Sequence, residues 1–186
     1  MVKLVKGQND LLSQYPACIN EWDFNKNHPL LPDAVIAGSS KKVWWICCKG
    51  HSYEQSINLH VGQGYGCPYC SHRKVLTGYN DLETLFPDIA TEWHPYKKTE
   101  LKPSSITAYS KKKVWWLCSR GHSYEQTVER RTRRGSACYY CSGHKVLKGF
   151  NDLASVNPNL SVEWHPSKNA PLTPYVHNVA NAERSK

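Results

Sequence analysis

Hydrophobic and polar residues alternate in a short segment that occurs twice in the chain. Within residues 41–56, this alternation places Val43 and Trp45 on one face of an extended strand and Trp44 on the other. A turn of the form Cys-x3-His separates this strand from a second one, "SYEQ". We therefore predict a β-hairpin here and another at residues 112–127, which carry the same pattern.

The segments that precede each hairpin predict short helices. An Asn-Asp-Leu triplet offers a side chain that can cap a helix N-terminus. A proline then separates a first short helix from a second one that ends near a Glu-Trp pair. After the hairpin, we predict a glycine-bearing loop that leads to a Cys-x2-Cys knuckle. These elements indicate a small α+β fold, with short helices beside a β-hairpin.

The recurrence of these elements reveals an internal repeat. Residues 41–56 and 112–127 are identical at 12 of 16 positions, and the same offset aligns the flanking segments without an insertion. We predict a first module at 1–77, a second at 78–148 and a partial third repeat at 149–186. The third repeat ends before its cysteines would occur, so it is either a C-terminal cap without metal ligands or the remnant of a longer array. A module this small tends to need a metal, a disulfide or a partner for stability.

Cysteine and histidine residues in each module have the spacing of a zinc site. Each module has Cys-x3-His and, fifteen residues later, Cys-x2-Cys, and a hairpin can bring two such pairs to one tetrahedral ion. Cys48 aligns with Ser119, so we predict that it is not a ligand. Four ligands of this type close the coordination shell of zinc, so we predict structural zinc, with two ions per chain. The predicted ligands are Cys47, His51, Cys67 and Cys70 in the first module and Cys118, His122, Cys138 and Cys141 in the second.

Other uses of these residues fit the sequence less well. A disulfide framework suits a secreted protein, and we find no secretory signal pattern. A thioredoxin-like motif would follow a strand in a βαβ unit, and an iron–sulfur cluster usually takes four cysteines. Cys18 aligns with Ile89 and is expected to be a buried apolar residue. His94 and His165 precede prolines and are expected to cap or pack.

The combined motifs "VWWxCxxGHSYEQ", "CxYCS", "KVLxGxNDL" and "EWHP" cover nearly the whole chain. This set resembles the probable zinc-ribbon domain family, which consists of repeated small modules in bacteria, phages and large DNA viruses. The resemblance implies tandem zinc-ribbon or treble-clef-like modules and the same metal positions. It also implies a function that involves DNA, because such modules often occur beside nuclease domains. One departure is Tyr139, where the first module has Pro68.

Charge indicates a nucleic-acid partner and points to the second module. The chain has a formal net charge of +9, and residues 78–148 carry 13 basic and 7 acidic side chains, against 8 and 5 in residues 1–77. Basic side chains beside aromatic ones can hold a phosphate backbone and stack on bases, although a solvated charged surface is an alternative. The candidate nucleic-acid contacts are Arg130, Arg131, Arg133 and Arg134 in a predicted loop, Lys111, Lys112 and Lys113 before the hairpin, and Tyr139 and Tyr140 in the knuckle.

The leading hypothesis is a non-enzymatic zinc module that binds nucleic acid, DNA rather than RNA. The alternative is a protein-interaction factor of a phage or mobile element that docks on a host or nucleoprotein complex. A nuclease is disfavoured because the acidic residues near "EWHP" are single, which does not make a metal-nuclease site. With no apolar run near 18 residues, we expect no membrane association and an intracellular, cytoplasmic location.

Overall fold

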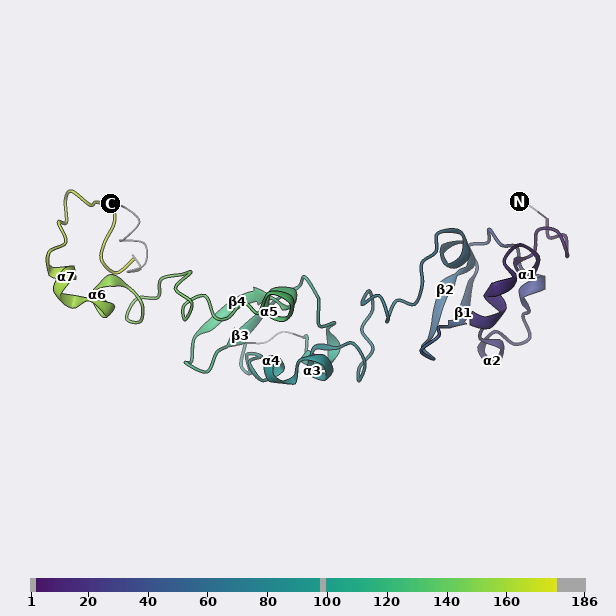
Figure 1. Cartoon of the computed structure of the whole chain (residues 1–186), viewed down its shortest axis with the longest axis horizontal. Coiled ribbons are helices and arrows are strands. Elements are labelled where there is room, and N and C mark those ends of the chain that lie inside the picture. Colours follow the sequence, from purple (N-terminus) through teal and green to yellow (C-terminus); the bar gives the residue numbers. More distant parts are fainter. Residues whose placement is uncertain (1–2, 98–99, 177–186) are drawn as a thin grey trace. The chain divides into compact units, whose positions relative to one another are not determined.

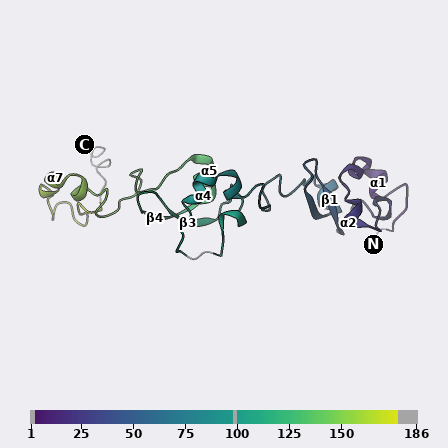
Figure 2. The same cartoon turned by 90° about the horizontal axis from the view of Figure 1, so that it is seen from below.

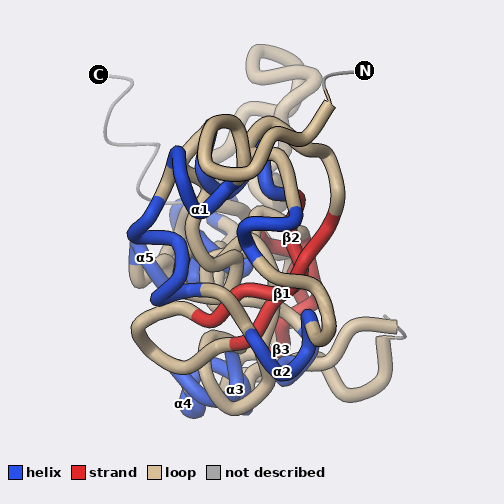
Figure 3. Tube along the Cα trace, turned by 90° about the vertical axis from the view of Figure 1, so that its right-hand side faces the viewer, coloured by secondary structure: helices blue, strands red, loops and turns tan. Residues whose placement is uncertain are grey.

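The computed structural model of the chain describes residues 3–97 and 100–176. It separates into two compact units, Met1–Asn80 and Asp81–Lys186, which are coloured purple to blue and teal to yellow in Figure 1. Each unit combines short helices with one two-stranded sheet, as the α+β prediction required (Figures 1 and 2). Long connecting segments join these short elements (Figure 3).

The first unit begins with helices and continues into its hairpin. Strands β1 (Lys42–Ile46) and β2 (Ser52–Ser56) pair in antiparallel register, with Trp45 opposite Tyr53. Val43 and Trp45 are buried and Trp44 is partly exposed, which confirms the predicted alternation of faces. The elements are α1 (Leu11–Gln14), the 3-10 turn η1 (Pro16–Glu21), α2 (Phe24–Asn27), the 3-10 turn η2 (Pro32–Ala34), β1 (Lys42–Ile46), β2 (Ser52–Ser56) and the π-helical turn η3 (Asn58–Gly62).

The second unit repeats this order and adds a longer helix. Strands β3 and β4 pair in the same antiparallel register, with Trp116 opposite Tyr124. The unit also contains the third repeat, which is represented by two short helices. The elements are α3 (Leu82–Leu85), α4 (Pro87–Thr91), the 3-10 turn η4 (Pro103–Ser105), β3 (Lys113–Leu117), β4 (Ser123–Thr127), α5 (Val128–Arg134), α6 (Leu153–Val156) and α7 (Pro158–Val162).

The predicted N-caps and proline breaks are confirmed. Asp10, Asp81 and Asp152 each accept a hydrogen bond from a backbone N–H three residues later, which satisfies an otherwise unpaired donor at the start of a helix. A proline starts the helical segment that follows, so the chain turns before the tryptophan. In the first unit, Trp22 then packs edge-on against Trp45, with ring centroids 5.6 Å apart.

The prediction of a glycine-bearing loop after the hairpin is wrong for the second module, where residues 128–134 form helix α5. Thr127 caps its N-terminus, and Gly135 ends it with a left-handed backbone at φ 56°. Five of its seven residues are arginine or glutamate, which are good helix formers, and Glu129 pairs with Arg133 one turn later at 3.2 Å. The first module has a single π-helical turn at the equivalent place.

The third repeat keeps its helices within the described residues, and its last residues, 177–186, lie outside them. Asp152 caps α6, as its counterparts do in the two modules. Several apolar side chains of this repeat are exposed, and Val162 is the most exposed at 87%. In residues 3–97 and 100–176, no helix combines the length and the apolar character needed to span a bilayer.

Candidate metal centres

The β-hairpin of the first module positions the first pair of ligands. Cys47 follows β1 and His51 precedes β2, so the turn between the strands places their side chains together. The Cys47 N–H donates to the His51 carbonyl at 3.1 Å, and the Gly50 N–H donates to the Cys47 carbonyl at 2.8 Å. Gly50 has φ 79°, a left-handed conformation that glycine adopts without a steric penalty. The glycine of "CxxGH" therefore allows the tight turn between the ligands.

The knuckle after the hairpin supplies the second pair of ligands, Cys67 and Cys70. The backbone N–H and the hydroxyl of Ser71 both donate to the Cys67 carbonyl, at 3.2 and 2.9 Å. These bonds hold the Cys-x2-Cys segment as a compact turn. Cys67 is buried and Cys70 is partly buried. The donor atoms of all four side chains lie within 4.8 Å of one another.

The spacing of the donor atoms in the first module fits a tetrahedral zinc ion. Zn–S bonds of about 2.3 Å and Zn–N bonds of about 2.0 Å place two sulfurs about 3.8 Å apart, and a sulfur and a nitrogen about 3.5 Å apart. In the structure, Sγ of Cys47 and Sγ of Cys70 are 3.8 Å apart. The three sulfurs lie 3.3 to 3.7 Å from Nδ1 of His51. The arrangement identifies Nδ1 as the donor atom of the histidine.

The second module reproduces this geometry. Sγ of Cys118 and Sγ of Cys141 are 3.9 Å apart, and Nδ1 of His122 lies 3.3 to 3.7 Å from the three sulfurs, including that of Cys138. Both groups offer three sulfurs and one nitrogen, a donor set that suits zinc and fills a four-coordinate shell. Such closed sites stabilise a fold and leave no open position for a substrate.

The thiols of the first site differ in acidity. Burial raises the pKa of Cys47, but hydrogen bonds from the backbone N–H groups of Lys49 and His51 and from the side chains of Cys70 and Cys67 together outweigh this effect, so its pKa lies below the ordinary value. Burial dominates at Cys67 and raises its pKa to about 11. Zinc binding to this site therefore displaces protons and weakens as the pH falls.

Residues from the start of the following repeat complete each zinc site, and the motif analysis missed this role. The Tyr79 ring packs on the His51 imidazole with centroids 4.2 Å apart, and Phe150 packs on His122 at the same separation. Asn80 donates from Nδ2 to the carbonyls of Tyr69 and Lys74, at 2.8 and 2.9 Å, and accepts from the Leu76 N–H. The repeated "GxND" motif was the available signal.

Cys18, Cys48, His94 and His165 behave as predicted. Cys48 is exposed and lies outside the ligand group, whereas Cys18 is buried among apolar residues. Nδ1 of His94 accepts the N–H groups of Tyr96 and Lys97, both at 3.2 Å. Nδ1 of His165 accepts a backbone N–H in the same way. These histidines therefore cap turns.

The structure corrects one of the candidate nucleic-acid contacts. Arg131 is 6% exposed and pairs with Glu92 through its guanidinium, so it belongs to the interior of the second module. Arg130, Arg133 and Arg134 are exposed along α5. The lysines at 111–113 are also exposed, and the knuckle tyrosines Tyr139 and Tyr140 are partly buried.

Comparison with known proteins identifies the family. A family described as a probable treble clef zinc finger domain matches residues 18–73 and 89–144, once in each module. No curated protein matches the chain. The two family matches cover more than half of the chain, and each contains one complete Cys3His group. The chain therefore belongs to the probable treble clef zinc finger family, with two tandem modules that each hold one zinc ion.

Proposed function

We propose that this chain is a non-enzymatic module that binds nucleic acid, DNA in preference to RNA, chiefly through its second zinc module. The zinc ions hold the hairpin and knuckle of each module together, and side chains on that frame make the contacts. The preference for DNA rests on the family resemblance.

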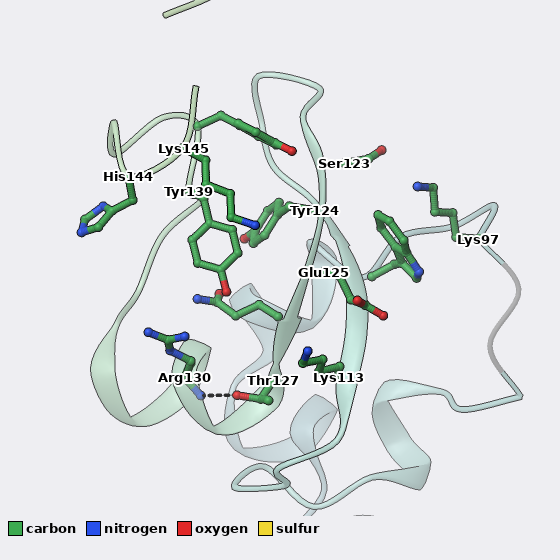
Figure 4. A pocket seen from close by; sticks show the side chains of 13 residues that line it. Lys97, Lys113, Ser123, Tyr124, Glu125, Thr127, Arg130, Tyr139, His144 and Lys145 are labelled. Carbon is green, nitrogen blue, oxygen red and sulfur yellow. Dashed lines mark hydrogen bonds between the residues drawn. The ribbon is translucent and has the colours of Figure 1, made fainter. Parts of the chain in front are cut away.

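A cationic, aromatic groove beside β4 carries this proposal. It has a volume of about 670 Å³. Figure 4 shows Arg130, Tyr139 and Lys145 on one side of β4, and Lys97 and Lys113 on the other. Positive charges that flank a concave surface attract a phosphate backbone, and aromatic rings beside them stack on bases. The remaining lining residues are Trp115, Ser123, Tyr124, Glu125, Gln126, Thr127, Tyr140 and His144.

The two modules differ at the side of the groove formed by α5 and the knuckle. Arg130 and Tyr139 of the second module align with Leu59 and Pro68 of the first. Arg133 and Arg134 extend the positive charge along α5, whereas the first module has uncharged residues at those positions. The first module therefore lacks the arginines, which bind phosphate through two hydrogen bonds at once, and should bind a phosphate backbone more weakly.

Fluorescence anisotropy with single- and double-stranded DNA and RNA at two salt concentrations tests the proposal. The variant Arg130→Gln/Arg133→Gln/Arg134→Gln removes the exposed arginines of α5 and leaves Arg131 and the zinc ligands in place. Glutamine keeps the helix, so zinc content should not change. We expect the slope of log affinity against log salt to become shallower by up to about 2–3, since each lost phosphate contact removes close to one.

Removal of lysines from the first module serves as the control. Lys42 and Lys74 align with groove lysines of the second module, so Lys42→Gln/Lys74→Gln should reduce affinity less than the arginine variant. An unchanged affinity and salt slope in the arginine variant would contradict the proposal, because α5 would then be only a solvated surface.

The alternative of a protein-interaction factor has its own supporting observation. The third repeat exposes several apolar side chains, among which Val162 is 87%, Val176 56% and Val156 54% exposed. Exposed apolar side chains that form a contiguous patch are typical of surfaces that bind another protein. A stoichiometric complex that persists at high salt would favour this function, because salt screens phosphate contacts and does not weaken apolar ones.

A further inference from the structure

The second module contains a buried carboxamide that lacks hydrogen-bond partners. Gln126 lies on β4 and is 1% exposed. Within residues 3–97 and 100–176, neither its Nε2 nor its Oε1 has a partner, and the same holds for the hydroxyl of Tyr124. Buried polar groups are nearly always paired, so an unpaired donor and acceptor on one side chain calls for an explanation.

Gln126 borders two hollows. The residue lines the groove beside β4 and also a smaller hollow of about 110 Å³. Arg130, Tyr139 and His144 line both. Arg130 and His144 are exposed, and such side chains change rotamer within nanoseconds. Rotation of these side chains would uncover the carboxamide to a ligand in the groove.

The chemistry of a carboxamide matches the edge of a nucleobase. Its one acceptor and one pair of donors form paired hydrogen bonds with adjacent donor and acceptor groups, as asparagine and glutamine do with adenine. The Tyr139 ring lines the same groove, where Nζ of Lys145 lies 5.1 Å from the ring centre. A base that displaces this flexible lysine can stack on the ring. The cations around β4 would hold the phosphates on either side.

We propose that the second module binds one unpaired nucleobase in the groove beside β4, with Gln126 hydrogen-bonded to the base edge and Tyr139 stacked on the base. This inference rests on the proposed function and names its substrate as single-stranded nucleic acid. In a duplex, the Watson–Crick edges are paired and both faces of each base are stacked, so no base has a face free for Tyr139. Zinc contributes by fixing Tyr139, which lies between the ligands Cys138 and Cys141.

The first module provides an internal comparison. Gln55 aligns with Gln126 but is partly exposed, so water can satisfy its carboxamide. Pro68 takes the place of the stacking tyrosine. Only the second module should therefore bind a base in this way, which predicts one base site per chain.

Abasic DNA tests this inference directly. Anisotropy compares a short single-stranded oligodeoxynucleotide with the same strand in which abasic residues replace the nucleotides. We expect the wild-type chain to bind the abasic strand about tenfold more weakly, because stacking and base-edge bonds are lost. Gln126→Met keeps the length of the side chain and removes its polar atoms. This variant should bind the natural strand about tenfold more weakly and discriminate much less against the abasic one.

Two further variants keep the test decisive. Gln55→Met is the matched control and should behave as the wild type. If Gln126→Met does not fold with two zinc ions, Tyr139→Leu removes the stacking ring and should produce the same loss of discrimination. If Gln126→Met folds and retains the wild-type discrimination, Gln126 has only a structural role and the inference is wrong.

The outcomes also separate this inference from the proposed function. Salt-dependent binding that treats natural and abasic strands alike would overturn the base site and leave the phosphate-binding function intact. Failure of the wild-type chain to bind any nucleic acid would overturn both.

Discussion

The two zinc modules share a frame but differ at one buried position next to a hairpin tryptophan. In the first module, His60 stacks on Trp45 with ring centroids 3.8 Å apart, and its Nε2 lies 2.9 Å from a carboxylate oxygen of Glu21. Burial lowers the pKa of His60, and the opposing effect of Glu21 is smaller. The imidazole is therefore neutral at pH 7 and donates a hydrogen bond to the carboxylate.

In the second module, the aligned residue is an arginine. The guanidinium carbon of Arg131 lies 5.5 Å from the centre of the Trp116 ring, and the side chain pairs with Glu92. A titratable group and a permanent cation thus fill the same site, between a tryptophan and a glutamate. Arg131, one of the four arginines that suggested nucleic-acid binding by the second module, therefore serves the packing of that module.

The largest expected effect comes from removing a zinc ligand in one module only. Cys47→Ser and Cys118→Ser should each lose one of two zinc ions and unfold the affected module, because structural zinc contributes on the order of 10 kcal/mol of apparent binding energy that is also folding energy. Elemental analysis and circular dichroism measure this. If either variant keeps two ions and native structure, the assignment of ligands is wrong.

The asparagine that follows each zinc knuckle should matter more in the first module. The side chain of Asn80 is fully buried and makes three hydrogen bonds, whereas the side chain of Asn151 makes the equivalent three but is partly exposed. Asn80→Ala should lower the free energy of unfolding by about 3 kcal/mol, because it leaves buried backbone groups unpaired. Asn151→Ala should cost less, since water can reach the freed groups. Chemical denaturation compares the two, and equal losses would contradict this account.

Removal of the buried cation tests the comparison between His60 and Arg131. Arg131→Met should lower stability by about 2 kcal/mol, because Glu92 loses its partner; this glutamate is 32% exposed, so water limits the penalty. The salt slope of nucleic-acid binding should not change. A shallower slope would return Arg131 to the set of phosphate contacts.

Acid should affect the first module more than the second. The pKa of His60 is lowered in the fold, so the unfolded chain takes up a proton first as the pH falls. The stability contributed by neutral His60 is therefore present above about pH 6.5 and is lost as the pH falls from there towards the folded pKa. Arg131 does not titrate in this range. Hydrogen exchange between pH 7 and pH 5 should show the difference, and His60→Gln should remove it.

The smallest effect is expected at the cysteine beside a ligand. Cys48 is exposed, and the second module already has Ser119 at this position. Cys48→Ser should change stability by less than about 0.5 kcal/mol and leave both zinc ions bound. Loss of an ion would show that the register of the first site is wrong.

Local patterns predicted much of the fold and the zinc ligands. Alternation separated Trp45 from Trp44 onto opposite faces without showing which face is buried, aspartates identified the helix starts, and the repeat distinguished Cys47 from Cys48. These features depend on residues close in sequence or on comparison of the two modules. The helix at 128–134 was also signalled, by Thr127 and Gly135, but the arginines between them were interpreted as a loop.

Other features depend on contacts between distant residues. Arg131 is buried because Glu92, 39 residues earlier, reaches it across the module. The role of Asn80 depends on backbone carbonyls that face it only after the knuckle has folded. The Gln126 carboxamide lacks partners because of the residues packed around it. Gln55 has nearly the same neighbours in sequence but is partly exposed, so the local sequence does not predict this difference.

Hydrogen exchange of the wild-type chain with and without a short single-stranded DNA tests the central claim, that the second module makes the main contact. The account predicts slower exchange in β4, α5 and the knuckle that follows, residues 123–145, and little change at the aligned residues 52–74. Protection confined to the first module, or to the third repeat, would contradict it.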